Sequence, residues 1–231
     1  EFEGSKDNNI VWMDKGSHDF TPFKDANPAC LAGEEYKAIA YGDDPKGAYA
    51  FKSSDGIHWS FLQEAPILTD GAFDTQNLAF WDELRGEYRA YIRDFEDGVR
   101  IIKTATSKDF RTWGALVKLE YPGAPTEALY TNQVKPYYRA PHIYMGFPTR
   151  YNERGWSPSM EALPNVEHRK MRSSCSDRYG MAITDGLFMT SRDGVTFKRW
   201  GEAFLRPGLR TRDNRSEEHT SKLQSHHPIS Y

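Results

Sequence analysis

The chain has 231 residues, a formal net charge of −3, 38% hydrophobic residues and 14% aromatic residues. This charge gives no support to nucleic-acid binding through a basic surface, and no apolar run approaches the roughly 18 residues that a membrane span requires. Cys30 and Cys175 lie far apart and form neither a metal motif nor a disulfide framework. The sequence therefore demands neither a metal nor an organic cofactor.

The first predicted strands lie in the N-terminal quarter of the chain. Residues 8–13, NNIVWM, predict an edge strand, and a turn-rich approach follows it. Asp25 then stands on a Pro-containing turn, Asp25-Ala26-Asn27-Pro28, ahead of a strand pair at EYKAIAYG and GAYAFKSS. An acid placed beside such a pair is a candidate for chemistry, because rigid strands hold it in place.

Residues 73–94 predict a hairpin with polar residues at its mouth. The segment begins with Asp74, Gln76 and Asn77, runs apolar, turns at residues 83–86 and returns as EYRAYIR. Alternating side chains have the two-residue period of a half-buried strand, and the short break that contains Gly86 fits the turn.

A short motif recurs three times and predicts the fold class. It reads S-x-D-[G/F]-x-[H/T]-[W/F] and spans 53–59, 107–113 and 191–197. The first two copies start 54 residues apart and the next two 84 apart, which fits one further period plus an insertion. A repeat of about 50 residues made of short strands indicates a β-propeller with one four-stranded blade per repeat. We expect the Ser and Asp to bond the turn backbone, and we assign the motif no chemistry.

An acid precedes each of three successive predicted blades: Asp25, Asp74 and Glu127. Innermost strands line the central channel of a propeller. The three carboxyl groups are therefore expected to converge at one end of the channel axis.

Residues 148–180 do not fit the repeat and predict a long loop, with a short helix within SMEALPNVEHRKM. Long loops in compact domains are usually functional or disordered. Arg150, Arg154 and Trp156 are candidates to reach over the channel, with Trp156 as a sugar-stacking platform. A fourth blade is expected to begin at YGMAITDGLF.

The C-terminal residues 215–231 are interpreted as foreign to the protein. RSEEHTSKLQS differs at one position from a translated sequencing adapter, so His219, His226 and His227 are not read as a metal site. The natural domain is taken as residues 1–214, an incomplete β-propeller. No signal peptide is visible, and a secreted or periplasmic location is the working expectation.

These features resemble the five-bladed β-propeller glycoside hydrolases of families 32, 43, 62 and 68, nearest to bacterial family 32-like proteins, over residues 8–214. Asp74 and the strand after it resemble the Arg-Asp-Pro segment of that group. Asp25-Ala26-Asn27-Pro28 resembles its Asn-Asp-Pro-Asn-Gly segment, and Glu127 stands where its Glu-Cys segment has the acid. Phe73 and Thr75 replace the Arg and Pro beside Asp74, and Ala128 replaces the Cys after Glu127.

The resemblance implies cleavage of a fructoside, arabinoside or related sugar in an oligo- or polysaccharide. Asp25 would be the nucleophile or base, Glu127 the general acid and Asp74 the group that bonds sugar hydroxyls, with Asp94 as an alternative acid. Asp25 and Glu127 should then lie about 5–10 Å apart. The expected substrate-binding residues are Asn27, Gln76, Asn77, Arg93, Asp94, Tyr130, Asn132, Gln133, Arg150 and Trp156.

Three other functions remain open. A non-catalytic carbohydrate-binding propeller would keep the amides and aromatics without a working acid pair. A structural or protein-interaction propeller would scatter its acids around the rim. A phosphorylase would need basic residues to hold phosphate. Arg93 and Arg150 could fill this role, so this alternative stays open. The sequence fixes no oligomeric state.

Overall fold

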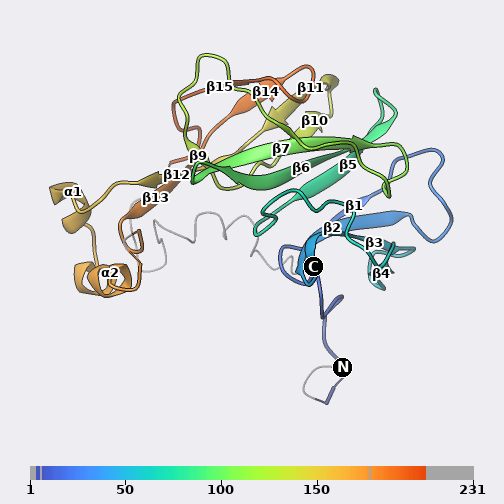
Figure 1. The fold of residues 1–231 in the computed structure, drawn as a ribbon, viewed down its shortest axis with the longest axis horizontal. Coiled ribbons are helices and arrows are strands. Elements are labelled where there is room, and N and C mark those ends of the chain that lie inside the picture. Colours follow the sequence, from blue (N-terminus) through green and yellow to red (C-terminus); the bar gives the residue numbers. More distant parts are fainter. Residues whose placement is uncertain (1–3, 6, 177, 207–231) are drawn as a thin grey trace. The chain divides into compact units, whose positions relative to one another are not determined.

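The computed structural model describes residues 4–5, 7–176 and 178–206 (Figure 1). The prediction about residues 215–231 lies outside these residues. The chain forms two compact units: unit 1 comprises the chain up to Phe95 together with Ile102–Lys118, and unit 2 comprises Glu96–Ile101 and the chain from Leu119 onward. In the described part of the chain, no helix is long and apolar enough to cross a membrane.

The first sheet of unit 1 is a four-stranded antiparallel meander in the order β1-β2-β3-β4. Its strands are β1 (Thr21–Lys24), β2 (Tyr36–Asp43), β3 (Lys46–Ser53) and β4 (Ser60–Phe61). The predicted strand pair is confirmed as β2 and β3, which pair from Tyr36↔Ser53 to Asp43↔Lys46. The predicted edge strand at residues 8–13 is wrong. Trp12 instead packs its ring edge-on against Phe51 and Phe61, so this segment is held by aromatic contacts rather than by a ladder.

The second sheet has the order β5-β6-β7-β8. Its strands are β5 (Leu78–Asp82), β6 (Glu87–Glu96), β7 (Val99–Ser107) and β8 (Val117–Lys118). The predicted hairpin is confirmed as β5 and β6, with the turn at residues 83–86. Apart from the hairpin residues 96–101, this sheet belongs to unit 1.

Unit 2 contains two sheets built from the same stretches of chain. One has the order β10-β11-β14-β15 and the other the order β13-β12-β9. The strands are β9 (Ala128–Leu129), β10 (Lys135–Tyr137), β11 (Ala140–Gly146), β12 (Thr149–Glu153), β13 (Ala182–Gly186), β14 (Met189–Ser191) and β15 (Phe197–Arg199). Two-residue breaks separate β11 from β12 and β13 from β14, so each pair acts as one bent strand that serves both sheets.

The described residues therefore hold three sequence repeats in four antiparallel sheets. Residues 128–153 and 182–199 form one repeat, because β13 pairs with β12 and β14 pairs with β11. The assignment of residues 179–200 to a separate fourth repeat is wrong. The insertion between β12 and β13 separates the two parts of this repeat, so the sequence did not indicate that they belong together. It contains two short helices, α1 (Pro158–Glu161) and α2 (Val166–Ser173), where one short helix was predicted.

The three motif turns have one hydrogen-bonding pattern, as predicted. In the first, Ser53 Oγ accepts from Gly56 N at 2.9 Å, and Asp55 Oδ1 accepts from the next two backbone N–H groups at 2.8 Å each. The equivalent bonds recur at 107–113 and 191–197, within 2.7–2.9 Å. These N–H groups lower the pKa of Asp193 to about 2, although burial of the carboxyl group acts in the opposite direction.

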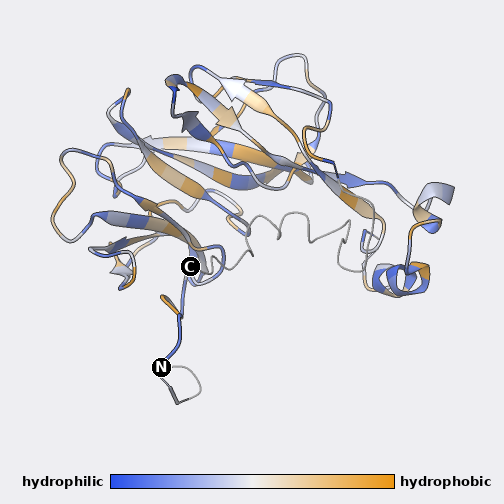
Figure 2. Cartoon of the chain, turned by 180° about the vertical axis from the view of Figure 1, so that it is seen from behind, coloured by the Kyte–Doolittle hydropathy of each residue, from blue (hydrophilic) through white to orange (hydrophobic). Residues whose placement is uncertain are grey.

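The core of unit 1 joins the facing surfaces of its two sheets. It contains small and branched residues such as Ile39, Ala50 and Ala90 together with the buried rings of Phe73 and Phe110. Apolar residues follow the strands of the sheets, whereas α2 is mainly hydrophilic (Figure 2). The sheets thus form a scaffold. The polar residues described next project from its loops and strand ends.

Candidate functional site

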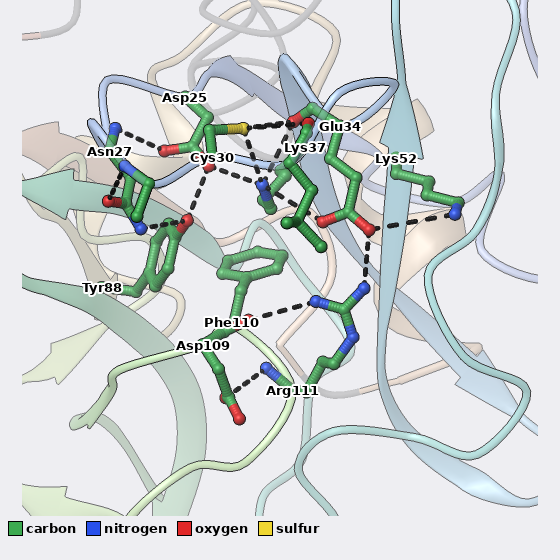
Figure 3. Close-up of polar contacts among 12 residues, drawn as sticks. Asp25, Asn27, Cys30, Glu34, Lys37, Lys52, Tyr88, Asp109, Phe110 and Arg111 are labelled. Carbon is green, nitrogen blue, oxygen red and sulfur yellow. Dashed lines mark hydrogen bonds and ion pairs between the residues drawn. The ribbon is translucent and has the colours of Figure 1, made fainter.

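Asp25 lies directly after β1, and its carboxylate is enclosed by polar partners (Figure 3). Lys37 Nζ on β2 donates to Oδ2 at 2.5 Å, and the Tyr88 hydroxyl on β6 donates to the same oxygen at 2.6 Å. The backbone N–H of Asn27 donates to Oδ1 at 2.9 Å. Solvent reaches 0% of the Asp25 side chain and 2% of the Lys37 side chain.

This geometry bears on the predicted nucleophile. Both oxygens of Asp25 are occupied by protein donors, so in this conformation the carboxyl group is not open to a ligand. The predicted sugar contact from Asn27 competes with an internal bond, because its Nδ2 donates to the Tyr88 hydroxyl at 3.0 Å. The catalytic role of Asp25 stays a prediction.

Glu34 extends this buried network toward the second sheet. Its carboxylate lies 3.6 Å from Lys37 Nζ and 2.6 Å from Arg111 Nη2, while Lys52 stands 3.9 Å away. Arg111 belongs to the second motif turn, so the motif holds a charged residue against the Asp25 loop. The only feature of the sequence that could have indicated this contact is the unusual Arg at a turn position.

Two weakly acidic groups border Asp25, and each has a raised pKa. Burial, together with the hydrogen bond to the Asp25 carboxylate, raises the pKa of the Tyr88 hydroxyl well above its ordinary value. Burial and the same carboxylate raise the pKa of the Cys30 thiol, although Lys37 Nζ lies 3.4 Å from its sulfur. Both groups therefore stay protonated at neutral pH.

Asp74 is the most open of the three predicted acids, with half of its side chain exposed. Arg93 Nη2 lies 3.5 Å from its Oδ2, and the Arg93 guanidinium stacks on Phe95 at 4.6 Å. Gln76 is half-buried in the same loop. Asp74 is thus exposed at the mouth of the hairpin, whereas its partner Arg93 is buried.

Asn77 and Asp94 each form hydrogen bonds or ion pairs with other residues of unit 1. Asn77 is fully buried, its Nδ2 donates to the carbonyls of Phe73 and Thr75, and its Oδ1 accepts from Arg93 N. Asn77 therefore shapes the loop that carries Asp74. Asp94 forms a 2.7 Å ion pair with Lys103. The predicted ligand contacts of both residues stay predictions.

In unit 2, Glu127 stands immediately before β9 between two arginines. Arg150 Nη1 donates to its Oε1 at 2.8 Å, and Arg199 Nη1 donates to its Oε2. Burial of the carboxyl group acts to raise its pKa, but the bonds from Arg199 and Arg150 outweigh this effect and lower it below the ordinary value of 4.5. Glu127 is therefore ionised at neutral pH in this structure, and its predicted role as proton donor stays a prediction.

Arg150 connects Glu127 to a second carboxylate that the sequence reading did not select. Its Nε and Nη2 donate to the two oxygens of Asp185 on β13 at 2.9 and 2.7 Å. These bonds to Asp185 raise the pKa of Arg150 further. Both carboxylates bond the same guanidinium at 2.7–2.9 Å, so Glu127 and Asp185 lie close to each other. We call Glu127, Arg150, Asp185 and Arg199 the carboxylate–arginine cluster.

The remaining predicted residues of unit 2 lie on the strands and loops around β9 and β12. Tyr130 stacks with Tyr151, their ring centroids 6.3 Å apart, and the Arg100 guanidinium lies 4.6 Å from the Tyr151 ring. Asn132 is buried, and Gln133 accepts from the Thr131 hydroxyl at 2.9 Å. Trp156 lies in the insertion with the Arg169 guanidinium 5.3 Å from its ring.

Asp25 and Asp74 belong to unit 1 and Glu127 to unit 2, so their predicted convergence stays a prediction. Lys37, Tyr88, Asp185 and Arg199 are the polar residues that sequence reasoning missed. Each lies within a strand, where the alternating pattern made it look like an ordinary strand position. Among the described residues, no group of three or more His, Cys, Asp or Glu side chains is arranged to hold a metal ion.

No family model and no curated protein matches this chain. Solved structures match at low identity. A glycosyl hydrolase from Bacteroides ovatus is 10% identical with a TM-score of 0.52, over 85% of this chain and 53% of that one. Another Bacteroides ovatus protein, named as a glycoside hydrolase, is 12% identical with a TM-score of 0.51, over 85% and 54%.

An α-L-arabinofuranosidase from Fusarium graminearum, solved with an iminosugar inhibitor, is 10% identical with a TM-score of 0.52, over 80% of this chain and 50% of that one. At such identities the likeness shows the fold alone. It confirms the predicted fold class, all-β with antiparallel sheets of the kind that propeller glycoside hydrolases contain. The chain spans about half the length of the structures it matches.

Proposed function

We propose that this chain is part of a glycoside hydrolase that cleaves a fructoside, arabinoside or related sugar in an oligo- or polysaccharide. The observation that carries the proposal is the carboxylate–arginine cluster, in which Arg150 links Glu127 and Asp185. Cleavage of a glycosidic bond uses two carboxyl groups at a limited separation. The fold likeness to glycoside hydrolases supports the same reaction class.

Within this proposal Glu127 acts as the ionised carboxylate, because Arg150 and Arg199 lower its pKa. It attacks the anomeric carbon or activates water, while Asp185 is the second carboxyl group of the cluster. Asp25 and Asp74 are kept as proposed catalytic residues of unit 1, each to be tested by itself. Tyr130 and Trp156 are the proposed sugar-stacking rings.

The phosphorylase alternative is less well supported by Arg150 than the sequence suggested. Four of its five N–H donors are engaged by Glu127, Asp185 and the carbonyl of Gly201. A phosphate would have to displace these carboxylates. Arg93 supports that alternative no better, because its side chain is 3% exposed and already lies 3.5 Å from Asp74.

The test uses the longest natural form of the protein and a panel of fructosides, arabinosides and galactosides, with product anomers followed by NMR. Glu127→Gln and Asp185→Asn should each lower kcat by about 10²-fold or more, and the exposed Glu202→Gln should leave it unchanged. A substitution whose effect disappears on activated aryl glycosides identifies the proton donor. Full activity in both cluster variants would contradict the assignment.

A non-catalytic carbohydrate-binding propeller is the second candidate. It is favoured by the burial of Asp25 and by its pairing with Lys37, which leave that carboxylate without an open oxygen. This candidate predicts that calorimetry detects oligosaccharide binding while no substrate of the panel is turned over.

A further inference from the structure

The insertion between β12 and β13, residues 154–181, differs in charge from the rest of the chain. It contains five basic residues and three acids, a formal net charge of +2. The whole chain carries −3, so the remaining residues, with 25 basic and 30 acidic side chains, together carry −5. A local excess of one sign attracts partners of the opposite sign. The basic residues are Arg154, Arg169, Lys170, Arg172 and Arg178, and the acids are Glu161, Glu167 and Asp177.

The five basic side chains of the insertion have different surroundings. Arg169 is buried, and its guanidinium donates to four backbone carbonyls of the insertion, so its role is to hold this segment together. Arg154 and Lys170 are exposed, and Arg172 and Arg178 are partly exposed. Four of the five positive charges therefore reach the surface.

Two of these arginines share one aromatic ring. The guanidinium carbons of Arg172 and Arg178 each lie 5.6 Å from the centroid of the Tyr179 ring. Cation–π contacts of this length hold a guanidinium in place. Tyr179 therefore keeps two like charges near each other, and an anion bound by both would offset their repulsion. A guanidinium also presents paired N–H donors whose spacing matches an oxyanion such as a carboxylate.

A carboxylate of the sheet interacts with this pair. Burial acts to lower the pKa of Arg178, but its hydrogen bond to the Tyr179 hydroxyl, with smaller contributions from Tyr151 and Glu153, raises it. Glu153 is the last residue of β12 and is itself exposed. Counting Glu153 together with the insertion still leaves a net charge of +1.

The insertion leaves the sheet at the strand ends that hold the carboxylate–arginine cluster. It begins after Glu153 and ends before Ala182. Arg150 stands three residues before the first of these ends and Asp185 three residues after the second, which is about 10 Å along a strand. Figure 1 shows α1 and α2 beyond the ends of β12 and β13. A polymer held at the cluster can therefore contact the insertion as well.

We propose that the insertion binds an anionic polysaccharide, whose sugars carry carboxylate or sulfate groups, and that such a polymer is the substrate of the cluster. This inference rests on the proposed glycoside hydrolase function and adds the charge of its substrate. The positive insertion is complementary to such a polymer, whereas the −5 of the remaining residues repels it. Arg172 and Arg178 bind its acidic groups, and Trp156 of the same insertion stacks on a sugar ring.

The first test measures binding and does not depend on activity. Calorimetry on the 231-residue chain compares polygalacturonate and a sulfated galactan with neutral arabinan of similar length. At least one acidic polymer should bind tenfold or more tightly than arabinan, with an affinity that falls as salt is added. The preferred polymer distinguishes carboxylate from sulfate. Equal binding of arabinan, or tighter binding of random-sequence RNA at the same charge concentration, would overturn the proposal.

The second test assigns the binding to two arginines. Arg172→Gln/Arg178→Gln should weaken binding of the acidic polymer at least tenfold, because each guanidinium contributes charge-assisted hydrogen bonds. Lys135→Gln/Lys198→Gln is the matched control, since it removes two exposed positive charges of unit 2 outside the insertion. It should change the affinity less than twofold, and equal weakening in both would overturn the proposal. Arg172→Lys/Arg178→Lys keeps both charges and should bind with intermediate affinity.

Turnover separates this inference from the proposed function. In the longest natural form, acidic oligosaccharides should have a higher kcat/KM than neutral ones, and Arg172→Gln/Arg178→Gln should raise KM with little change in kcat. Turnover of neutral glycans alone would overturn the charge assignment and keep the hydrolase. Binding of an acidic polymer without turnover of any glycan would contradict the hydrolase and support the binding surface.

Discussion

Asp25 and Lys37 form a 2.5 Å ion pair from which solvent is excluded on both sides. Transfer of two charges into such a site costs several kcal/mol per ion, and the pair is stable only if further hydrogen bonds satisfy it. Tyr88, the Asn27 backbone and the Glu34 carbonyl supply these bonds. The loop after β1 is therefore fixed to β2 and β6 by a polar network that is sensitive to the loss of any one charge.

The first prediction concerns this ion pair. Lys37→Met should lower the free energy of unfolding by about 3–5 kcal/mol, because it leaves the Asp25 carboxylate buried without its cation. The double variant Asp25→Leu/Lys37→Met should be more stable than Lys37→Met alone, since it removes the Asp25 carboxylate together with its cation, while Glu34 keeps its ion pair with Arg111. Urea unfolding measures both values.

Lys52→Met serves as the control, because Lys52 is partly exposed and lies 3.9 Å from Glu34. It should change stability by no more than about 0.5 kcal/mol. If Lys37→Met proved as mild as this control, the pair would not hold the loop.

The second prediction concerns the fourth position of the repeated turn, which is Gly56, Phe110 or Gly194. All three have a positive φ, of 78°, 64° and 80° respectively. Gly56→Ala should destabilise the protein by about 1 kcal/mol through backbone strain, because its Cβ would only touch the Tyr36 ring at 3.4 Å. Gly114→Ala is the control, since Gly114 has no positive φ and its Cβ would meet one atom at 3.6 Å. Thermal unfolding of both variants gives the comparison, and equal shifts would exclude strain as the cause.

Phe110 occupies the same turn position but carries a large side chain, so replacing it with Gly tests the opposite change. Its fully buried ring packs against Phe23 and Tyr88. Phe110→Gly should relieve strain yet still destabilise the protein by about 2–4 kcal/mol, because losing a buried Phe side chain costs about 3–5 kcal/mol. A variant as stable as the parent would mean that the strained backbone offsets the whole packing contribution.

Local sequence signals were sufficient to predict much of the fold. The strand pair within residues 36–53 and the alternating hairpin within residues 73–94 were predicted, and the recurring Ser and Asp predicted three turns with one hydrogen-bonding pattern. The third repeat could not be predicted correctly, because its strands bend at Phe147-Pro148 and Leu187-Phe188 and an insertion separates them. Such pairing joins residues 29 to 47 positions apart in the sequence, and the local alternation of polar and apolar residues carries no information about it.

The candidate site was less predictable for a related reason. The three acids, Asp25, Asp74 and Glu127, could be selected from the sequence because each interrupts an apolar pattern. The residues that pair with them could not, because they occupy ordinary strand positions. Lys37 and Arg199 occupy strand positions where a long cation usually faces solvent, and both are buried only because a carboxylate from another segment meets them. For Glu127, the bonds from Arg199 and Arg150 outweigh burial and lower the pKa of the carboxyl group.

The third prediction concerns the insertion of unit 2. Arg169 on α2 is buried and donates to four carbonyls, those of Met160, Leu163, Pro164 and Gly180. Arg169→Gln should therefore loosen residues 156–180 while the strands stay folded. Limited proteolysis should cut the variant at least tenfold faster within the insertion, and the exposed Lys170→Gln should resemble the parent. Faster cleavage throughout the chain would instead point to a global role.

The last prediction concerns the charge state of Glu127 and its dependence on pH. Because Arg199 and Arg150 lower its pKa below 4.5, the stabilisation from these pairs is complete above that pH and is lost as the pH falls through the folded-state value. Glu127→Gln should therefore lower the free energy of unfolding by about 1.5–3 kcal/mol at pH 7, and the difference should shrink as the pH falls below 4.5 toward the lowered pKa of Glu127.

Glu202→Gln, a fully exposed change in the same unit, should show no such pH dependence. If Glu127 acts as the base or nucleophile, the acidic limb of kcat/KM should also lie below pH 4.5 in the parent, because that limb reports the carboxylate of the free enzyme. A proton donor would instead require the protonated form, and activity would then fall as the pH rises through the pKa of Glu127. An alkaline limb that Glu127→Gln removes would return Glu127 to the role of general acid, whereas a stability difference that persists at pH 2–3 would show that its two arginines do not act through its charge.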